Sequence, residues 1–282
     1  MRILITGAGG MLGLDVSRAA HDAGHEAISL AHGALDIRDA TAVASAVAQA
    51  APDVLINCAA WTDVDGAEAA FERALEVNGA GAGHVAAAGA AAGAFVVHVS
   101  SDYVFDGRKR SPYVESDPVA PLSAYGQSKL AGERAVLDAA GADACAVVRS
   151  SWLFGAGGRC FPRTIMRLAA ERERLEVVSD QFGCPTFTGH LAPALVTIAC
   201  ERRAGVLHVV ASDSCSWFQL AVETVALSGA ECEVAPIPTD GYPLPAPRPA
   251  YSVLASERGA PVLPGWRDGL RAFAAQLAEV AA

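Results

Sequence analysis

Lysine is scarce in this chain. Only Lys109 and Lys129 are lysines among 21 basic residues in a total of 282. Long apolar runs are also missing: 52% of the residues are hydrophobic, yet no stretch of about eighteen apolar residues occurs, so we predict no membrane span. The apolar start, residues 1–5, ends at Thr6 without the longer apolar segment of a secretion signal. We therefore expect a cytoplasmic protein.

Positive charge is in deficit as well. A net charge of −10 argues against nucleic acids and anionic membrane surfaces as partners. No Cys-x-x-Cys pair occurs among the seven cysteines, which stand at positions 58, 145, 160, 184, 200, 215 and 232. Such an odd, unpatterned set is typical of reduced thiols and not of disulfides or zinc sites. No acidic cluster indicates a metal site, so we predict no metal. The sequence leaves open whether the protein is a monomer or a homodimer.

The first half of the chain alternates between short apolar runs and helical stretches. We expect strands at 2–6, 26–30, 53–57, 95–100 and 144–149. Between them we expect helices at 11–23, 39–50, 67–92 and 122–136. Strands that are apolar throughout belong to a parallel sheet covered on both faces. The sequence therefore predicts an α/β fold with a Rossmann-type, doubly wound parallel sheet.

The second half is less regular, and we expect it to build a smaller, mixed C-terminal substrate lobe. Helices are expected at 161–174, 191–203, 216–227 and 266–280, strands at 175–178 and 206–210, and an extended Pro-rich loop at 236–249. We assign 1–151, with the elements at about 175–210, to a dinucleotide-binding domain. The substrate lobe then comprises 152–174 and 211–282, above the carboxyl edge of the sheet, where ligands bind in open α/β folds.

A glycine-rich loop follows the first predicted strand directly. Gly7, Gly10 and Gly13, with Met11 and Leu12 between them, form Gly-x-x-Gly-x-x-Gly at the start of a helix. Glycines at this place allow a tight turn and a close approach to a pyrophosphate, which the helix N-terminus attracts. The alternative is a set of ordinary turn glycines in a chain rich in alanine and glycine.

The second strand ends without the acidic residue that usually binds the ribose of NAD. Because nothing here would repel a 2′-phosphate and His32 is near, we favour NADPH, with NADH as the alternative. Asp36, followed by Ile37, would reach the adenine edge or cap the next helix. We expect the third strand to end along the cofactor at Ala59, Ala60 and Trp61, although packing is a fair alternative for Trp61.

Tyr125 and Lys129 stand four residues apart in a predicted helix, so their side chains share one face. A phenol beside a fixed ammonium is a proton donor with a lowered pKa. Ser101 follows the fourth predicted strand, and we expect its hydroxyl to face the same crevice and to orient a substrate carbonyl. A serine, a tyrosine and a lysine at these places resemble the catalytic set of the short-chain dehydrogenases/reductases.

The resemblance extends beyond the superfamily to one particular family within it. The chain resembles the dTDP-4-dehydrorhamnose reductase family through motifs that occur in family order along nearly the whole sequence. These motifs are GAGGMLG at 7–13, LDI at 35–37, NCAAWTDVD at 57–65, VN at 77–78, SDYVFDG at 101–107, YGQSKLAGE at 125–133, RSSWLFG at 149–155, QFGCPT at 181–186, RP at 248–249 and Ser252.

The resemblance implies NAD(P)H-dependent reduction of the C4 ketone of a dTDP-4-keto-6-deoxyhexose. Tyr125 would protonate the alkoxide, Lys129 would lower the phenol pKa and bind the nicotinamide ribose, and Ser101 would position the keto oxygen. Ser101 departs from the threonine that is common in the family. Asn78 would support the cofactor site. The substrate-binding residues would be Ser101, Asp102, Tyr103, Trp152, Gln181 and Arg248.

Plain alternatives exist for two of these residues: Trp152 as a core side chain and Arg248 as an exposed arginine in a Pro-rich loop. The resemblance also leaves two other functions open. Some relatives reduce other dTDP-keto-sugars in antibiotic pathways, of the dihydrostreptose type, and one branch serves as a non-catalytic regulatory subunit. Retention of the serine, tyrosine and lysine together argues against the second.

Overall fold

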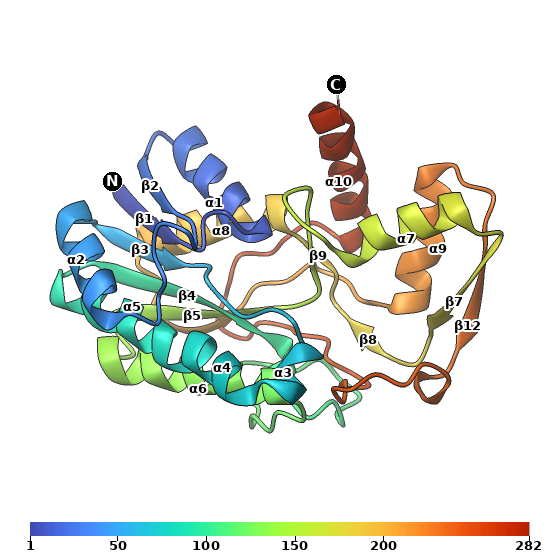
Figure 1. Cartoon of the computed structure of the whole chain (residues 1–282), viewed down its shortest axis with the longest axis horizontal. Coiled ribbons are helices and arrows are strands. Elements are labelled where there is room, and N and C mark those ends of the chain that lie inside the picture. Colours follow the sequence, from blue (N-terminus) through green and yellow to red (C-terminus); the bar gives the residue numbers. More distant parts are fainter. Residues whose placement is uncertain (282) are drawn as a thin grey trace.

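The structure is a computed structural model that describes residues 1–281. Its centre is a six-stranded parallel sheet with the strand order β10-β5-β4-β3-β1-β2 (Figure 1). The strands are β1 (Arg2–Thr6), β2 (Glu26–Leu30), β3 (Val54–Asn57), β4 (Phe95–Ser101), β5 (Cys145–Ser150) and β10 (Gly205–His208). The predicted Rossmann-type α/β fold is confirmed.

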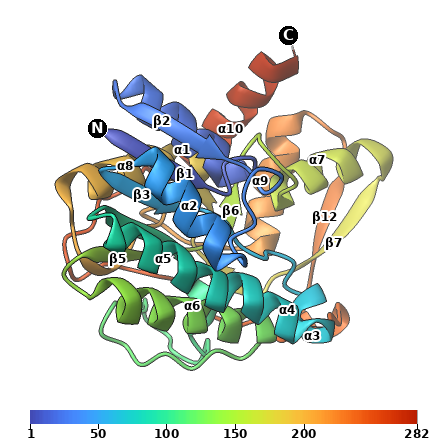
Figure 2. The same cartoon turned by 60° about the vertical axis from the view of Figure 1, so that its left-hand side comes forward.

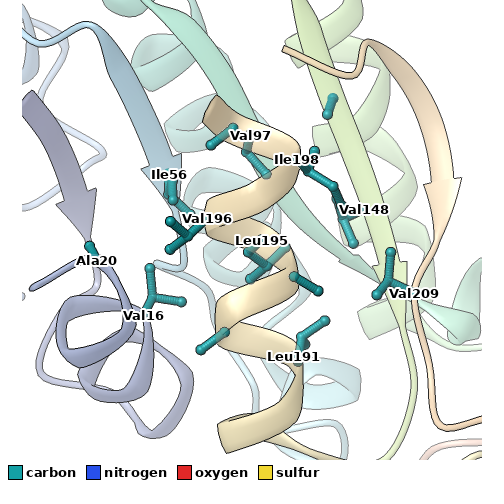
Figure 3. Packing of buried hydrophobic residues seen from close by; sticks show 14 of the residues in the cluster. Val16, Ala20, Ile56, Val97, Val148, Leu191, Leu195, Val196, Ile198 and Val209 are labelled. Carbon is teal, nitrogen blue, oxygen red and sulfur yellow. The ribbon is translucent and has the colours of Figure 1, made fainter. Parts of the chain in front are cut away.

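Helices cover both faces of this sheet. On one face, α1 (Met11–Asp22) and α8 (Thr188–Glu201) pack against apolar side chains of the central strands. Figure 3 shows Val196 of α8 between Ile56 of the sheet and Val16 of α1. On the other face lie α2 (Ala40–Ala50), α5 (Ala82–Ala91) and α6 (Ala124–Ala140). Burial on both faces explains why the strands are apolar throughout.

The strand order reverses between β1 and β3, which are neighbours in the sheet although β2 lies between them in the chain. Parallel strands present their carboxyl ends at one edge, and a crevice opens where the order reverses. The glycine loop after β1 and the small residues after β3 therefore meet at the same place. This is where an open α/β sheet binds its ligand.

A second, smaller lobe lies beside the sheet (Figure 1). Its strands β7 (Arg174–Val178) and β12 (Glu233–Ile237) pair in parallel, and α7 (Phe161–Glu171) and α9 (Trp217–Ser228) share a buried apolar cluster with them. Two short ribbons join this lobe to the strand ends: β6 (Leu153–Phe154) with β9 (Thr186–Phe187), and β8 (Phe182–Gly183) with β11 (Cys215–Ser216). The C-terminal helix α10 (Trp266–Ala281) follows.

One strand lies elsewhere than we predicted. We grouped 175–178 with the dinucleotide-binding domain, but β7 pairs only with β12, outside the six-stranded sheet. Its alternating burial, with Leu175 and Val177 buried and their neighbours exposed, suits a sheet covered on one face and not a central strand. Its partner strand comprises residues 233–237 and so includes Pro236 and Ile237, which we predicted as the start of the Pro-rich loop at 236–249; an edge strand of a two-stranded ribbon tolerates a proline.

The long helix predicted at 67–92 is broken. It consists of α3 (Gly66–Ala69), α4 (Phe71–Leu75), a π-helical turn over Glu76–Gly81 and α5. Figure 2 shows this series of helices beside α6. The backbone oxygen of Asn78, in the π turn, approaches Gly132 of α6 so closely that a Cβ at Gly132 would lie 2.1 Å from it. π turns of this kind are common at functional sites.

Candidate active site

The glycine loop forms a tight cradle at the crevice. Gly7 has φ +68°, and a Cβ there would lie 2.5 Å from the backbone nitrogen of Ala59, so only glycine fits. Gly10 caps α1 without any side-chain hydrogen bond, which leaves the first N–H groups of the helix available. Free N–H groups and the helix dipole suit a pyrophosphate. The residues present therefore fit a dinucleotide, with Gly13 buried and Met11 and Leu12 in the first turn of α1.

The end of β2 is occupied by an ion pair that the sequence did not reveal. Asp36 accepts two hydrogen bonds at 3.0 Å from the Nε of Arg38, which holds the pKa of Asp36 at about 2. His32 is exposed and close enough to lower that pKa further, and Ile37 is buried. Asp36 is thus an ionised partner of Arg38, which places a guanidinium beside the carboxylate that we predicted at the adenine edge.

The side-chain amide of Asn78, in the π turn, joins the loop after β3 to helix α6. Asn78 is 1% exposed and bonds both backbone groups of Trp61, accepting from its N–H at 2.8 Å and donating to its carbonyl at 3.1 Å. The same amide donates to the hydroxyl of Ser128 in α6 at 2.9 Å. Trp61 also packs with Tyr125 in a small apolar cluster. Asn78 therefore fixes the loop after β3, which includes Ala59 and Ala60, against the helix of the predicted proton donor.

Helix α6 places Tyr125 in its first turn and Lys129 one turn later. Ser123 caps the helix, accepting from the N–H of Gly126 at 3.1 Å. Lys129 is 2% exposed, and its Nζ donates to the carbonyl of Val99 in β4 at 2.7 Å. Burial lowers the pKa of Lys129 to about 8, which the charge of Glu133 partly opposes. The ammonium is thus anchored at the sheet edge beside the crevice.

The phenol of Tyr125 differs from our expectation. We predicted a lowered pKa, whereas burial raises the pKa of Tyr125 to about 12, and the charge of Asp102 adds to the rise. The hydroxyl of Ser101 acts in the opposite direction. Desolvation of the phenolate dominates, and Lys129 is bonded to Val99. Tyr125 is therefore held as the neutral, proton-bearing acid, and Ser101 lies beside it as predicted.

Asp102 is a buried carboxylate next to Ser101. It is 2% exposed, and the hydroxyls of three serines donate to its carboxylate: Ser101 at 3.0 Å, Ser151 at 3.1 Å and Ser252 at 2.5 Å. Burial raises the pKa of Asp102 to about 6, against the effect of these hydroxyls. The structure thus brings the predicted residues Ser101 and Asp102 together, with Asp102 beneath the crevice.

The sugar side of the crevice carries a pair of stacked tryptophans. Trp152 has φ +47°, a conformation that tryptophan rarely adopts. Its ring lies parallel to that of Trp217, with centroids 3.5 Å apart and 4° between the planes. A Cβ at Gly183 would lie 2.4 Å from the Trp152 ring, so the glycine backbone packs directly on it. The partly buried Trp152 is held in one orientation between α9 and the Gln181–Pro185 stretch.

Arg248 reaches the crevice through an ion pair. Its guanidinium donates to both carboxylate oxygens of Asp65, at 2.5 and 2.7 Å, across 183 residues of sequence. Arg248 also lowers the pKa of Tyr103, although burial raises it overall. The ring of Tyr103 meets that of Tyr125 edge-on at 5.7 Å. Arg248 and Tyr103 therefore border the proton donor.

Gln181 lies further along the same side. It is 6% exposed, and its side-chain amide donates to the hydroxyl of Thr239 at 3.1 Å. This bond ties the Gln181–Pro185 stretch to the loop after β12. Sequence reasoning missed Trp217, Asp65 and Ser151. Asp65 and Ser151 lie inside motifs that we quoted, whereas nothing local marks Trp217.

Comparison with known proteins agrees with this geometry. Residues 1–279 match the family model described as "RmlD substrate binding domain". The dTDP-4-dehydrorhamnose reductase of Mycolicibacterium smegmatis is 45% identical over 278 residues, which cover 96% of this chain and 84% of the relative. The chain belongs to the dTDP-4-dehydrorhamnose reductase family.

Two solved structures of this family have the same fold. A dTDP-4-dehydrorhamnose reductase of Clostridium acetobutylicum has a TM-score of 0.94 at 37% identity, covering 99% of this chain and 100% of that one. The reductase of Bacillus anthracis, solved in complex with NADP, has a TM-score of 0.93 at 35% identity, covering 96% and 98%. Family members are NAD(P)H-dependent oxidoreductases. Among the described residues of this chain, no helix is long and apolar enough to cross a membrane.

Proposed function

We propose that this protein reduces the C4 ketone of a dTDP-4-keto-6-deoxyhexose with NADPH, and that its substrate is dTDP-4-dehydrorhamnose. The observation that carries this proposal is the meeting of Ser101, Tyr125 and Lys129 at the carboxyl edge of the sheet, beside a loop shaped for a pyrophosphate. Family membership over almost the whole chain supports the substrate class.

Several residues of this chain would bind and orient the cofactor. When bound, the reduced nicotinamide supplies the hydride. Gly7, Gly10 and Gly13 would hold the pyrophosphate against α1, and Asn78 keeps the loop at Trp61 in place. Lys129, anchored to Val99, would bind the nicotinamide ribose and place a positive charge near the phenol.

Tyr125 acts as the acid. With its pKa raised to about 12, the phenol keeps its proton at neutral pH until negative charge develops on the sugar oxygen. Its proton then passes to that alkoxide, and the positive charge of Lys129 stabilises the phenolate that remains. Trp152, Tyr103 and Gln181 would border the sugar, and Arg248 would face the diphosphate.

The test is turnover with a defined product. Purified protein is mixed with NADPH and dTDP-4-dehydrorhamnose, absorbance is followed at 340 nm, and the product configuration at C4 is read by NMR. We expect stoichiometric NADPH oxidation and dTDP-L-rhamnose. Turnover of other dTDP-keto-sugars alone would assign the protein to a secondary-metabolite pathway. No turnover, with a partner enzyme co-purifying, would favour the regulatory subunit.

Two expectations from the sequence remain part of the proposal. The cytoplasm suits an enzyme that uses NADPH and nucleotide sugars, and monomer and homodimer both leave the crevice complete, because every residue named above comes from one chain. Light scattering coupled to size exclusion measures the oligomeric state directly. NADH is the alternative cofactor, and comparison of kcat/KM for the two dinucleotides decides between them.

A further inference from the structure

Three serines converge on one buried carboxylate beneath the crevice. Ser101 ends β4, Ser151 follows β5, and Ser252 belongs to the C-terminal segment, so the three come from distant parts of the sequence. Each donates its single hydroxyl proton to Asp102. Ser151 and Ser252 are each 1% exposed. A buried carboxylate with three donors is satisfied internally and has no exposed edge to offer a sugar.

The carboxylate fixes the direction of the Ser101 hydroxyl. Because the proton of Ser101 points to Asp102, its oxygen is left as an acceptor, and the N–H of Tyr103 donates to it at 3.2 Å. The same hydroxyl lies within reach of the Tyr125 phenol, and a hydrogen bond donated to that phenol lowers its pKa, so the one Ser101 proton serves either Asp102 or the phenol. The orientation of Ser101, and through it the surroundings of the phenol, therefore depend on Asp102.

The third serine links this centre to the segment that carries Arg248. Ser252 stands four residues after Arg248, and its backbone N–H donates to the carbonyl of Phe182 at 2.8 Å. The N–H of Phe182 in turn donates to the carbonyl of Ala250 at 2.9 Å. The segment is thus held on one side by Asp65 through Arg248 and on the other by Asp102 through Ser252.

We propose that Asp102 is a positioning residue that couples the Arg248 segment to the catalytic hydroxyl of Ser101. This role, which rests on the proposed reduction, replaces the substrate contact predicted for Asp102. Seating of the dTDP-sugar diphosphate on Arg248 would set Ser252, and Ser252 would hold Asp102 so that the single Ser101 proton can turn from this carboxylate to the ketone oxygen. Asp102 orients these groups without touching the substrate.

The charge of Asp102 has no basic partner to compensate it. No lysine or arginine within residues 1–281 donates a hydrogen bond to this carboxylate, and the titratable groups beside it are Tyr103, Tyr125 and Cys184, whose pKa values its charge raises. Three neutral hydroxyls and the backbone N–H of Asp102 itself therefore stabilise the carboxylate. This makes the geometry of each serine sensitive to the others.

The matched pair of variants is Ser252→Ala and Ser151→Ala. Both remove one hydroxyl from the same oxygen of Asp102, but only Ser252 comes from the segment that carries Arg248. We expect Ser252→Ala to lower kcat about tenfold, with KM for NADPH unchanged and KM for the dTDP-sugar within about threefold. Ser151→Ala should lower kcat less, and Ser252→Thr, which keeps the hydroxyl, should restore it.

Asp102→Asn is the direct variant. Its amide cannot accept three hydroxyl protons as the carboxylate does, so we expect kcat to fall at least tenfold with little change in KM for the sugar. A raised KM with unchanged kcat would make Asp102 a substrate ligand and overturn the proposal. Equal kcat in wild type, Ser252→Ala and Asp102→Asn would also overturn it. If Asp102→Asn does not fold, the comparison of Ser252→Ala with Ser252→Thr still decides.

A readout without substrate separates this proposal from the proposed function. Tyrosine labelled with ¹³C reports the ionisation of Tyr125 by NMR, and Tyr125→Phe assigns the signal. Asp102→Asn removes a negative charge and reorients Ser101, so we expect the Tyr125 pKa to fall. An unchanged pKa would contradict the coupling, whereas wild type that turns over no dTDP-4-dehydrorhamnose would contradict only the proposed function.

Discussion

At the scale of single residues, the charge of Lys129 sets the pH range of the reaction. Burial lowers its pKa to about 8, so the ammonium is charged below that pH and loses its proton as the pH rises through it. Only the charged form attracts a phenolate. We expect kcat, measured from initial rates at saturating NADPH, to fall as the pH rises through about 8. A kcat that stays constant well above this pH would contradict the assignment of Lys129.

Trp217 offers a second test at this scale. Because it stacks on Trp152, its removal should loosen the wall of the sugar pocket without affecting the proton donor. An aromatic pair contributes about 0.5–1.5 kcal/mol, so we expect Trp217→Ala to raise KM for the dTDP-sugar roughly 2- to 13-fold, with KM for NADPH unchanged. Trp217→Phe keeps an aromatic ring and is the matched control. Equal KM values for the alanine variant and wild type would contradict the assignment of Trp152 to the wall of the sugar pocket.

Single residues were predictable where a local pattern marks them. Tyr125 and Lys129 share one turn of a helix, and Gly7 follows a strand directly, so spacing alone indicates their neighbours. The three serines around Asp102 and the stack on Trp217 depend on contacts between distant segments, which no local spacing encodes. The pKa of Tyr125 was predicted in the wrong direction because burial, which the sequence does not show, raises it, and the opposing effect comes from the hydroxyl of Ser101.

At the scale of elements, the N-terminus of α6 positions the acid. Ser123, two residues before Tyr125, is 2% exposed, and its hydroxyl accepts from the N–H of Gly126. Loss of such a cap costs about 1 kcal/mol. We expect Ser123→Ala to lower the free energy of unfolding in urea by that amount and to reduce kcat, whereas Ser123→Thr should preserve both. An unchanged free energy of unfolding in the alanine variant would mean that another acceptor replaces the Ser123 hydroxyl for the N–H of Gly126.

Helix and strand positions followed from hydrophobic periodicity, but their continuity and pairing did not. Alanine-rich sequence over 67–92 predicts one helix, yet the structure has a π turn within it, at the place where the Asn78 backbone closely approaches Gly132. Residues 175–178 were predicted as a strand, whereas the partner strand at 233–237 lies more than fifty residues away in the sequence. Such partnerships are decided by tertiary contacts and not by propensity.

At the scale of the whole molecule, the Arg248–Asp65 pair joins the C-terminal segment to the loop after β3. The side chain of Arg248 is 14% exposed and that of Asp65 is 34% exposed, so water shields this pair less than it shields a fully exposed ion pair. We expect Asp65→Ala to raise KM for the dTDP-sugar about tenfold or more while KM for NADPH stays the same, because Arg248 loses its fixed position.

The exposed pair Arg174–Glu233 supplies the control for this experiment. Both of its side chains are more than half exposed, at 56% and 63%, and it lies on the β7–β12 ribbon. Glu233→Ala should change neither KM value, since exposed ion pairs contribute little. If Asp65→Ala behaves like Glu233→Ala, Arg248 does not serve the substrate, and the alternative of a merely structural arginine holds.

The sequence predicts the doubly wound sheet better than it predicts how the second lobe is attached to that sheet. Alternating apolar strands and helices indicate a doubly wound sheet, and the crevice follows from the parallel strands. How the second lobe is attached to that sheet depends on short ribbons of two residues, such as Phe182–Gly183 with Cys215–Ser216, which have no sequence pattern of their own.

The central claim is that Tyr125 donates the proton in the reduction of a dTDP-4-keto-sugar. Its most direct test compares NADPH oxidation at 340 nm, with dTDP-4-dehydrorhamnose, by wild type and Tyr125→Phe. We predict turnover by wild type and a loss of kcat of about 10²- to 10⁴-fold in the variant, with NADPH binding retained. Turnover by Tyr125→Phe at the wild-type rate would contradict the claim.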